Sequence, residues 1–146
     1  MQIDIKIDKS CKEPKVLIIT EKMTPEINEL VKCLSDTKLN AIVGFKDDYA
    51  ELLQQQDIIR LYTADQKVFA QTEQGEYRVK MRLYELEERL DKSLFLRISN
   101  SEMVNLKKIS KLDLSFSGTI CMELASNIHT YVSRRYVAKI KQVLGL

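Results

Sequence analysis

The pattern of apolar and polar positions begins with a short mixed segment. Isoleucines alternate with charged residues over positions 3–7, which predicts a strand with one buried face. The apolar run at residues 16–19 predicts a second, more fully buried strand over residues 16–20. Thr24-Pro25 is typical of a helix start, because Thr can cap the first turn and Pro lacks an N–H that this turn would leave free. Apolar residues then recur at helical spacing, and we expect this helix to end near Ser35-Asp36.

From residue 39 onward the pattern is mostly that of strands, with turns rich in Gly and polar residues. The predicted strands cover residues 41–45, 49–53, 58–62, 67–72, 76–79, 95–98, 112–116, 119–124 and 129–132. One helix interrupts them where Leu83, Leu86 and Leu90 recur at helical spacing, and another covers residues 133–144, with Ser133 as N-cap and Gly145 as C-cap. The sequence therefore predicts a β-dominated α+β protein: a β-β-α extension over residues 1–38, then a second domain over residues 39–146.

Composition excludes several classes of protein. Apolar residues make up 45% of the 146 residues, enough for a folded core. No segment approaches the roughly 20 consecutive apolar residues of a membrane-spanning helix, and the amino terminus lacks the pattern of a signal peptide. The three cysteines have no CxxC spacing, which argues against a disulfide framework or a zinc site. We expect a cytoplasmic protein that is not inserted in a membrane.

Charge is distributed unevenly along the chain. Residues 1–57 contain eight Lys and eleven Asp or Glu, a net charge of −3, whereas residues 58–146 contain fifteen Lys or Arg and ten Asp or Glu, a net charge of +5. Eight basic and three acidic residues within positions 97–146 account for the whole excess. A basic half suggests a polyanionic partner, and its alternative is uneven surface charge without a function.

Enzyme chemistry finds little support. His129 is the only histidine and lies in a predicted strand, while Cys121 and Ser133 lie in no nucleophile motif. Asp47-Asp48 is typical of a solvated turn, since no further ligand follows at the spacing of a cation-binding loop. The four glycines form no phosphate-binding loop. We therefore expect no catalytic residue, metal or cofactor.

Arg134 and Arg135 lie in the first turn of the last predicted helix. The helix dipole disfavours cations there, so two arginines behind Ser133 suggest a place where a phosphate group docks. The alternative is that both arginines fold back over nearby carboxylates.

A second polar group lies in residues 95–101, where a predicted strand runs into a polar loop. Asn100 could read an adenine edge through two hydrogen bonds, and Arg97 could hold guanine or phosphate. The alternative is an ordinary turn, because Ser-Asn-Ser sequences are common in turns.

These residues belong to a longer pattern, which resembles the LytTR DNA-binding domain of bacterial transcription regulators. The pattern is Phe95-x-Arg97-x-x-x-Ser101-x-x-Val104-Asn105-Leu106-x-x-Ile109, preceded by Leu83-x-x-Leu86-Glu87-x-x-Leu90 and followed by Val132-Ser133-Arg134-Arg135-Tyr136. Residues 57–62 resemble the first core strand of the family, and the resemblance covers about residues 39–146. It implies an elongated stack of antiparallel β-sheets with short helices, and no helix-turn-helix.

The resemblance also implies a function and a set of contact residues. LytTR domains bind double-stranded DNA through loops at one edge of their sheets, which enter successive major grooves. Three positions carry over: Gln66, Asn100 with Ser101 beside it, and Arg135 with Arg134. We further expect Lys67, Arg97 and Ser133 to contact DNA, and Lys108 to contact phosphate near the same edge. Many members carry a His where this chain has Ser99, so one contact is absent and the base preference is open.

The amino-terminal segment departs from most members of the family. Residues 1–38 are too short for a receiver domain, so the chain resembles the stand-alone LytTR regulators of Gram-positive bacteria. We expect a homodimer on paired promoter sites, with residues 1–38 as a dimerisation or regulatory segment. The alternative function is that of a protein-interaction adaptor or anti-activator, which would bind a regulatory protein partner through the acidic amino-terminal segment.

Overall fold

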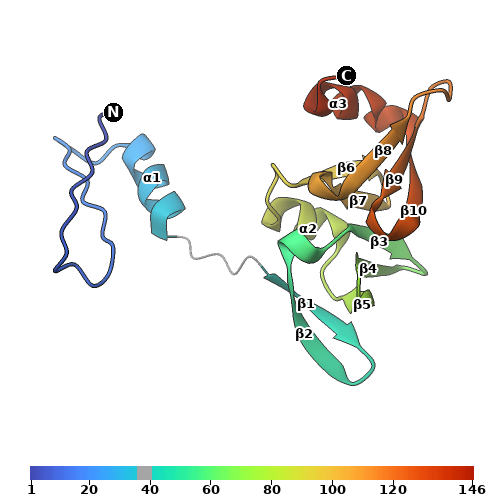
Figure 1. The fold of residues 1–146 in the computed structure, drawn as a ribbon, viewed down its shortest axis with the longest axis horizontal. Helices are drawn as coiled ribbons and strands as arrows, with labels where there is room; N and C mark the ends of the chain where they lie inside the picture. The colour runs from blue at the N-terminus through green and yellow to red at the C-terminus, as the bar shows by residue number, and fades with distance from the viewer. Residues whose placement is uncertain (36–40) are drawn as a thin grey trace. The chain divides into compact units, whose positions relative to one another are not determined.

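The computed structural model describes residues 1–35 and 41–146 (Figure 1). Internal contacts divide the chain into two compact units, Met1–Lys38 and Leu39–Leu146, which are described separately below. The predicted end of the first helix at Asp36 and the predicted domain boundary after residue 38 lie outside the described residues.

Three α-helices, ten strands and three short 3-10 helices make up the regular structure of the described residues. The α-helices are α1 (Pro25–Ser35), α2 (Leu83–Arg89) and α3 (Arg134–Leu144). The strands are β1 (Ala41–Lys46), β2 (Tyr49–Gln54), β3 (Arg60–Ala64), β4 (Lys67–Thr72), β5 (Gly75–Val79), β6 (Phe95–Ser99), β7 (Glu102–Asn105), β8 (Ile109–Asp113), β9 (Ile120–Leu124) and β10 (Ile128–Val132). The 3-10 helices are η1 (Gln55–Asp57), η2 (Leu106–Lys108) and η3 (Ala125–Asn127).

The first unit holds the predicted helix but not the predicted strands. The hydroxyl of Thr24 accepts a hydrogen bond from the N–H of Ile27 at 3.3 Å, which confirms Thr24 as the cap of α1. Residues 1–20 contain no strand, so the two strands predicted at residues 3–7 and 16–20 are wrong. Alternation marks only the side chains that would share a face, whereas a strand also needs a hydrogen-bonded neighbour. Ile3, Ile5 and Ile7 are 80%, 87% and 89% exposed, so they find no apolar surface within this structure.

The second unit is built on an antiparallel seven-stranded sheet with the order β2-β1-β5-β4-β3-β7-β6. Helix α2 covers one face of it, where Leu83, Leu86 and Leu90 are buried in a core with residues of β3, β4 and β5. The fold class predicted from the sequence, a β-dominated α+β protein with antiparallel sheets and short helices, is confirmed.

A three-stranded antiparallel sheet, β10-β9-β8, forms a second core with the far end of the larger sheet and with α3. Met103 belongs to the α2 core and its neighbour Val104 to this second core, because successive side chains of a strand point to opposite faces. Helix α3 packs against β6, and Ile140 is fully buried there. In Figure 1, α3 and the β1–β2 hairpin lie at opposite ends of this unit.

Two segments differ from their predictions. Residues 102–105 form β7, which the sequence pattern did not predict because the strand is only four residues long. The strand predicted at residues 112–116 is β8, Ile109–Asp113. It ends early because the carboxylate of Asp113 accepts hydrogen bonds from the N–H and hydroxyl of Ser115, at 2.9 and 2.6 Å, which turns the chain out of the sheet.

Candidate functional site

Two turns that are far apart in the sequence meet at one end of the seven-stranded sheet. Strand β3 is antiparallel to β7, with Tyr62 opposite Glu102, and the N–H of Thr63 donates to the carbonyl of Ser101 at 2.8 Å. The β3–β4 turn therefore lies on the same end of the sheet as the β6–β7 turn. This end is called the reading edge below, and it comprises the Asp65–Gln66 turn, the Ser99–Ser101 turn and the start of α3.

The β3–β4 turn holds Gln66 in an uncommon backbone conformation. Asp65 and Gln66 have φ angles of 50° and 63°, as in the type I′ turns that close two-residue hairpins. Gly or Asn usually occupies such positions, and a Gln there carries some strain. Both residues are exposed, as is Lys67, which begins β4. The hairpin therefore projects the Gln66 amide into solvent at the reading edge.

The β6–β7 turn is held from within by Arg97. Its Nε donates to the carbonyl of Ser99 at 2.9 Å, its Nη2 donates to the carbonyl of Asn100 at 2.7 Å, and its Nη1 lies 2.6 Å from a carboxylate oxygen of Glu87. Three of its five N–H groups thus fix the turn and tie it to α2. Arg97 therefore holds the backbone of this turn in place. The hydroxyl of Ser99 accepts from the N–H of Ser101 at 3.2 Å, which tightens the same turn.

Asn100 is exposed at the tip of this turn and contacts the last helix. The hydroxyl of Tyr136 donates to Oδ1 of Asn100 at 3.1 Å, which orients the amide. A carbonyl oxygen accepts two hydrogen bonds, so Oδ1 keeps one free lone pair, and no hydrogen bond of Nδ2 is seen within the described residues. The side chain can therefore present an acceptor and a donor together, as recognition of an adenine edge requires.

The start of α3 adjoins this turn, because the N–H of Ser133 donates to the carbonyl of Ile98 at 2.9 Å. The first turn of α3 contains no acidic residue, and Arg134 and Arg135 are both exposed. Their surroundings differ. A Cβ placed on Gly118 would lie 3.3 Å from Nε of Arg134, so Arg134 rests against the β8–β9 loop. No ion pair or hydrogen bond of the Arg135 side chain is found within the described residues, so its guanidinium remains available for a ligand.

Lys108 does not belong to the reading edge. It ends η2 after β7, and the N–H of Leu106 donates to the carbonyl of Leu94 at the beginning of β6. Lys108 therefore lies at the opposite end of the β6–β7 hairpin from Asn100, and its expected position near the same edge is wrong. The prediction assumed that Lys108 lies near Asn100 in space because it lies near Asn100 in the sequence. Strand β7 lies between the two residues and separates them along the hairpin.

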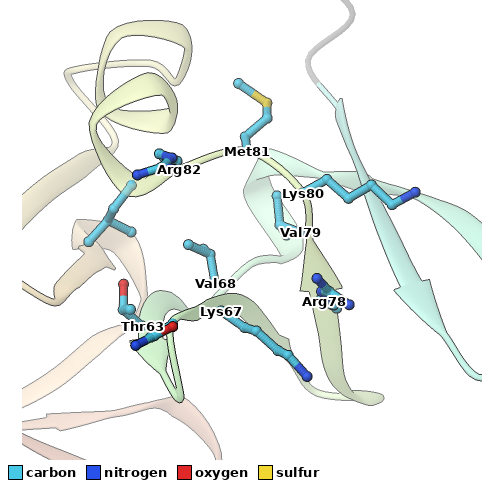
Figure 2. A pocket seen from close by; sticks show the side chains of 10 residues that line it. Thr63, Lys67, Val68, Arg78, Val79, Lys80, Met81 and Arg82 are labelled. Carbon is cyan, nitrogen blue, oxygen red and sulfur yellow. The ribbon is translucent and has the colours of Figure 1, made fainter.

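Sequence reasoning missed a group of basic side chains next to Gln66 and Lys67. Arg78, Lys80 and Arg82, from β5 and the segment leading to α2, line a concavity of about 680 Å³ together with these two residues (Figure 2). Strand β5 pairs with β4, Val68 opposite Val79, and this register brings the end of β5 to the reading edge. In the sequence these three residues alternate with Val79 and Met81, and the surrounding residues 58–96 hold seven basic and seven acidic residues, so net charge did not mark this group.

Two further findings concern the part of the chain that the structure describes. It contains no group of three or more His, Cys, Asp or Glu side chains placed to hold a metal ion. None of its helices is long and apolar enough to cross a membrane.

Comparisons with known proteins agree with this geometry. Residues 49–145 match the family model described as the LytTr DNA-binding domain. The chain is 33% identical over 147 residues to an uncharacterized HTH-type transcriptional regulator of Staphylococcus aureus strain NCTC 8325 and to its counterpart in strain MRSA252. Each alignment covers 100% of this chain and 99% of the relative.

A solved LytTr DNA-binding domain from Bacillus cereus has the same fold, with a TM-score of 0.70 at 22% identity, over 73% of this chain and 97% of that chain. The names of the staphylococcal relatives contain the term HTH, but five strands separate α2 from α3 here, so the described residues contain no helix-turn-helix.

Proposed function

Since the chain belongs to the LytTR family of DNA-binding domains, we propose that it is a transcription regulator that binds specific sequences in double-stranded DNA through its reading edge. One observation carries the proposal: the Gln66 turn, the Asn100 turn and the start of α3 lie at a single end of the fold. Each presents exposed polar or basic side chains there. The curated relatives that span the whole chain are transcriptional regulators by name, which supports the regulatory role.

The spacing of these three parts supports contacts in successive major grooves. The sheet order β4-β3-β7-β6 places three strand spacings, about 14 Å, between the Gln66 hairpin and β6. Helix α3, about 10 Å in diameter, packs beside β6. The Asn100 turn thus adjoins both the Gln66 hairpin and the start of α3. Successive major grooves on one face of B-DNA lie roughly 34 Å apart, and bending the duplex toward the protein would bring both grooves to these contacts.

Within this proposal the contact residues have distinct roles. Gln66, Asn100 and Arg135 face bases, because their polar ends are exposed at the reading edge. Contacts to the sugar-phosphate backbone of the DNA come from Lys67, Ser101, Ser133 and Arg134. Arg97 keeps the Asn100 turn in shape.

Association through the amino-terminal segment is part of the same proposal. The exposed isoleucines at positions 3, 5 and 7 have the alternation of a strand, and pairing with a second copy would bury them and form a homodimer.

The alternative function, that of an adaptor or anti-activator, assumed that the amino-terminal segment is acidic. Residues 1–38 contain seven Lys and seven Asp or Glu, so the acidic excess of the first 57 residues lies after residue 38. Charge therefore gives that alternative no support.

As a DNA-binding regulator, the protein would act in the cytoplasm.

The proposal is tested by measuring affinity for genomic promoter fragments and for random duplexes at two salt concentrations. Fluorescence anisotropy or gel shift should give a fragment that binds at least 10³-fold tighter than random DNA, with affinity falling steeply as salt rises. Equal affinity for all fragments, or affinity that does not respond to salt, would contradict the proposal.

A further inference from the structure

A basic concavity lies beside the β3–β4 turn, and the base-facing turns of the reading edge do not account for it. Four of its ten lining residues are basic, namely Lys67, Arg78, Lys80 and Arg82, and no carboxylate lines it. Val68, Val79 and Leu83, which are buried, form its floor. Organic ligand pockets are lined mostly by apolar and aromatic groups, whereas this lining suits an anion.

Some basic side chains of the second unit form ion pairs with carboxylates, and others do not. Arg60 lies 3.3 Å from a carboxylate oxygen of Glu102, and Arg97 lies 2.6 Å from one of Glu87. None of the four basic residues of the concavity pairs with a carboxylate in the described structure. Like charges collected without partners repel one another, and such an arrangement favours binding of a negatively charged ligand.

The side chains are not equally available. Nζ of Lys80 lies 4.5 Å from the centre of the Phe45 ring, and Figure 2 shows it directed away from the concavity, toward β1. Lys67 and Arg78 extend their charged ends to the same side in that view, and Arg82 lies across the concavity from them. Lys67, Arg78 and Arg82 are all exposed. These three are therefore the groups that a ligand can reach.

The place of the concavity beside the Gln66 turn indicates which anion it would bind. The concavity is also lined by Gln66, so it is continuous with the reading edge. Strand β5 lies one strand spacing, about 4.8 Å, beyond β4. A side chain at the centre of a major groove about 12 Å wide has a phosphate strand about 6 Å to each side. A hairpin tip that enters the groove would thus bring the end of β5 against one of the two phosphate strands.

We propose that Arg78 and Arg82, together with Lys67, hold phosphate groups of the DNA strand that borders the groove entered by the Gln66 turn. This site rests on the proposed DNA-binding function and extends it to the end of β5 and the segment that leads to α2, both of which lie outside the two base-facing turns. The site contributes affinity without sequence preference, since phosphates carry no direct sequence information.

The test uses the full chain with Arg78→Gln and Arg82→Gln, singly and combined, and Lys92→Gln as the matched control. Lys92 is exposed and precedes β6, at the opposite end of the sheet from Asn100. Each Arg variant should lower the slope of log affinity against log salt by about 0.9, and binding near 0.1 M salt should weaken by about eight-fold for specific and random duplexes alike. Lys92→Gln should change neither. Arg78→Lys, which keeps the charge, should restore most of the slope.

Ethylation interference locates the contact. Phosphates whose ethylation blocks binding of the wild-type protein should become tolerated in the Arg78→Gln, Arg82→Gln protein, in a cluster to one side of the protected bases. Melting temperatures of all variants, measured in parallel, should stay near that of the wild type because both side chains are exposed. A fall in melting temperature that Arg78→Lys also shows would assign Arg78 to the fold and overturn its part in the site.

Failure of this inference can be told from failure of the proposed function. Unchanged salt slopes, while Asn100→Ala still lowers specific affinity, would overturn the phosphate site alone. Loss of binding to inorganic phosphate in the variants, with unchanged DNA binding, would assign the concavity to a free anion and also overturn it. A wild-type protein without any preferred fragment would contradict the proposed function, and the slopes on random DNA would still decide whether Arg78 and Arg82 hold phosphate.

Discussion

At the scale of single residues, Asn100 is the position where specificity and stability can be separated. Its amide is exposed at the tip of a turn whose backbone is fixed by Arg97, so the side chain itself contributes little to the turn. Asn100→Ala should cost roughly 1–3 kcal/mol of affinity for the specific site and leave affinity for random DNA and the salt slope nearly unchanged. Measuring the melting temperature beside both affinities checks this, and a destabilised variant with an unchanged specificity ratio would show that Asn100 only supports the fold.

Tyr136 should affect sequence-specific DNA binding indirectly, through Asn100. Its hydroxyl donates to Oδ1 of Asn100, so Tyr136→Phe frees the amide to rotate without changing the packing of the ring. We expect a loss of about 1 kcal/mol in specific binding and little change in nonspecific binding or salt slope. In the Asn100→Ala background the same substitution should have no further effect on specificity. An independent loss in that double variant would show that Tyr136 acts on DNA by another route.

Tyr62 gives the molecule a response to alkaline pH. Burial, a hydrogen bond from its hydroxyl to Glu76 and the charge of that carboxylate raise the pKa of Tyr62 to about 12 from its ordinary value of 10.0. Because the folded state holds the neutral form, the stabilisation from this group is complete below pH 10 and is lost as pH rises toward 12. The melting temperature of the wild type should therefore fall more steeply over that range than that of Tyr62→Phe. Equal pH profiles of the two proteins would contradict the raised pKa.

At the scale of elements, α3 depends on burial more than on its own sequence propensity. Ile140 of α3 is fully buried in the second core, whereas Val143 on the same helix is 48% exposed. Ile140→Ala should lower the free energy of unfolding by about 2–4 kcal/mol, and Val143→Ala by about 0.5 kcal/mol or less. Urea denaturation measures both. Similar losses in the two variants would mean that helix propensity, not packing, holds α3 in place.

The elements differ in how far the sequence predicted them. Helices α1, α2 and α3 follow their predictions because local signals fix them: a Thr cap, leucines at helical spacing, and a Gly145 that adopts a φ of 72°. The β3–β4 hairpin was predicted from its polar turn in the same way. The strands predicted in residues 1–20 failed because a strand needs a partner that no local pattern guarantees. The short strand β7 was missed for the converse reason, since its partners β3 and β6, not its own four residues, define it.

At the scale of the whole molecule, the two units can be tested apart. Residues 39–146 contain both hydrophobic cores of the second unit, so a protein lacking residues 1–38 should still unfold in one cooperative transition. If residues 1–38 form the dimer, sedimentation equilibrium should give the full chain twice the monomer mass and the truncated chain the monomer mass. A truncated chain that remains dimeric would place the dimer contact in the second unit.

The sequence alone determined the fold class of the protein and its family resemblance, while the tertiary structure decided which residues lie together. Periodicity, caps and the motif around Phe95 and Arg97 are local in the chain, and they sufficed for the fold class, the family resemblance and the positions of Gln66, Asn100 and Arg135. Three-dimensional pairing was needed to place Lys108 at the opposite end of the β6–β7 hairpin from Asn100, and to show that Arg97 holds the Asn100 turn. It also collected Arg78 and Arg82 from a stretch, residues 58–96, in which seven basic and seven acidic residues cancel. Net charge along a chain sums over neighbours in sequence, whereas a ligand meets neighbours in space, and no carboxylate lines the concavity that these arginines share.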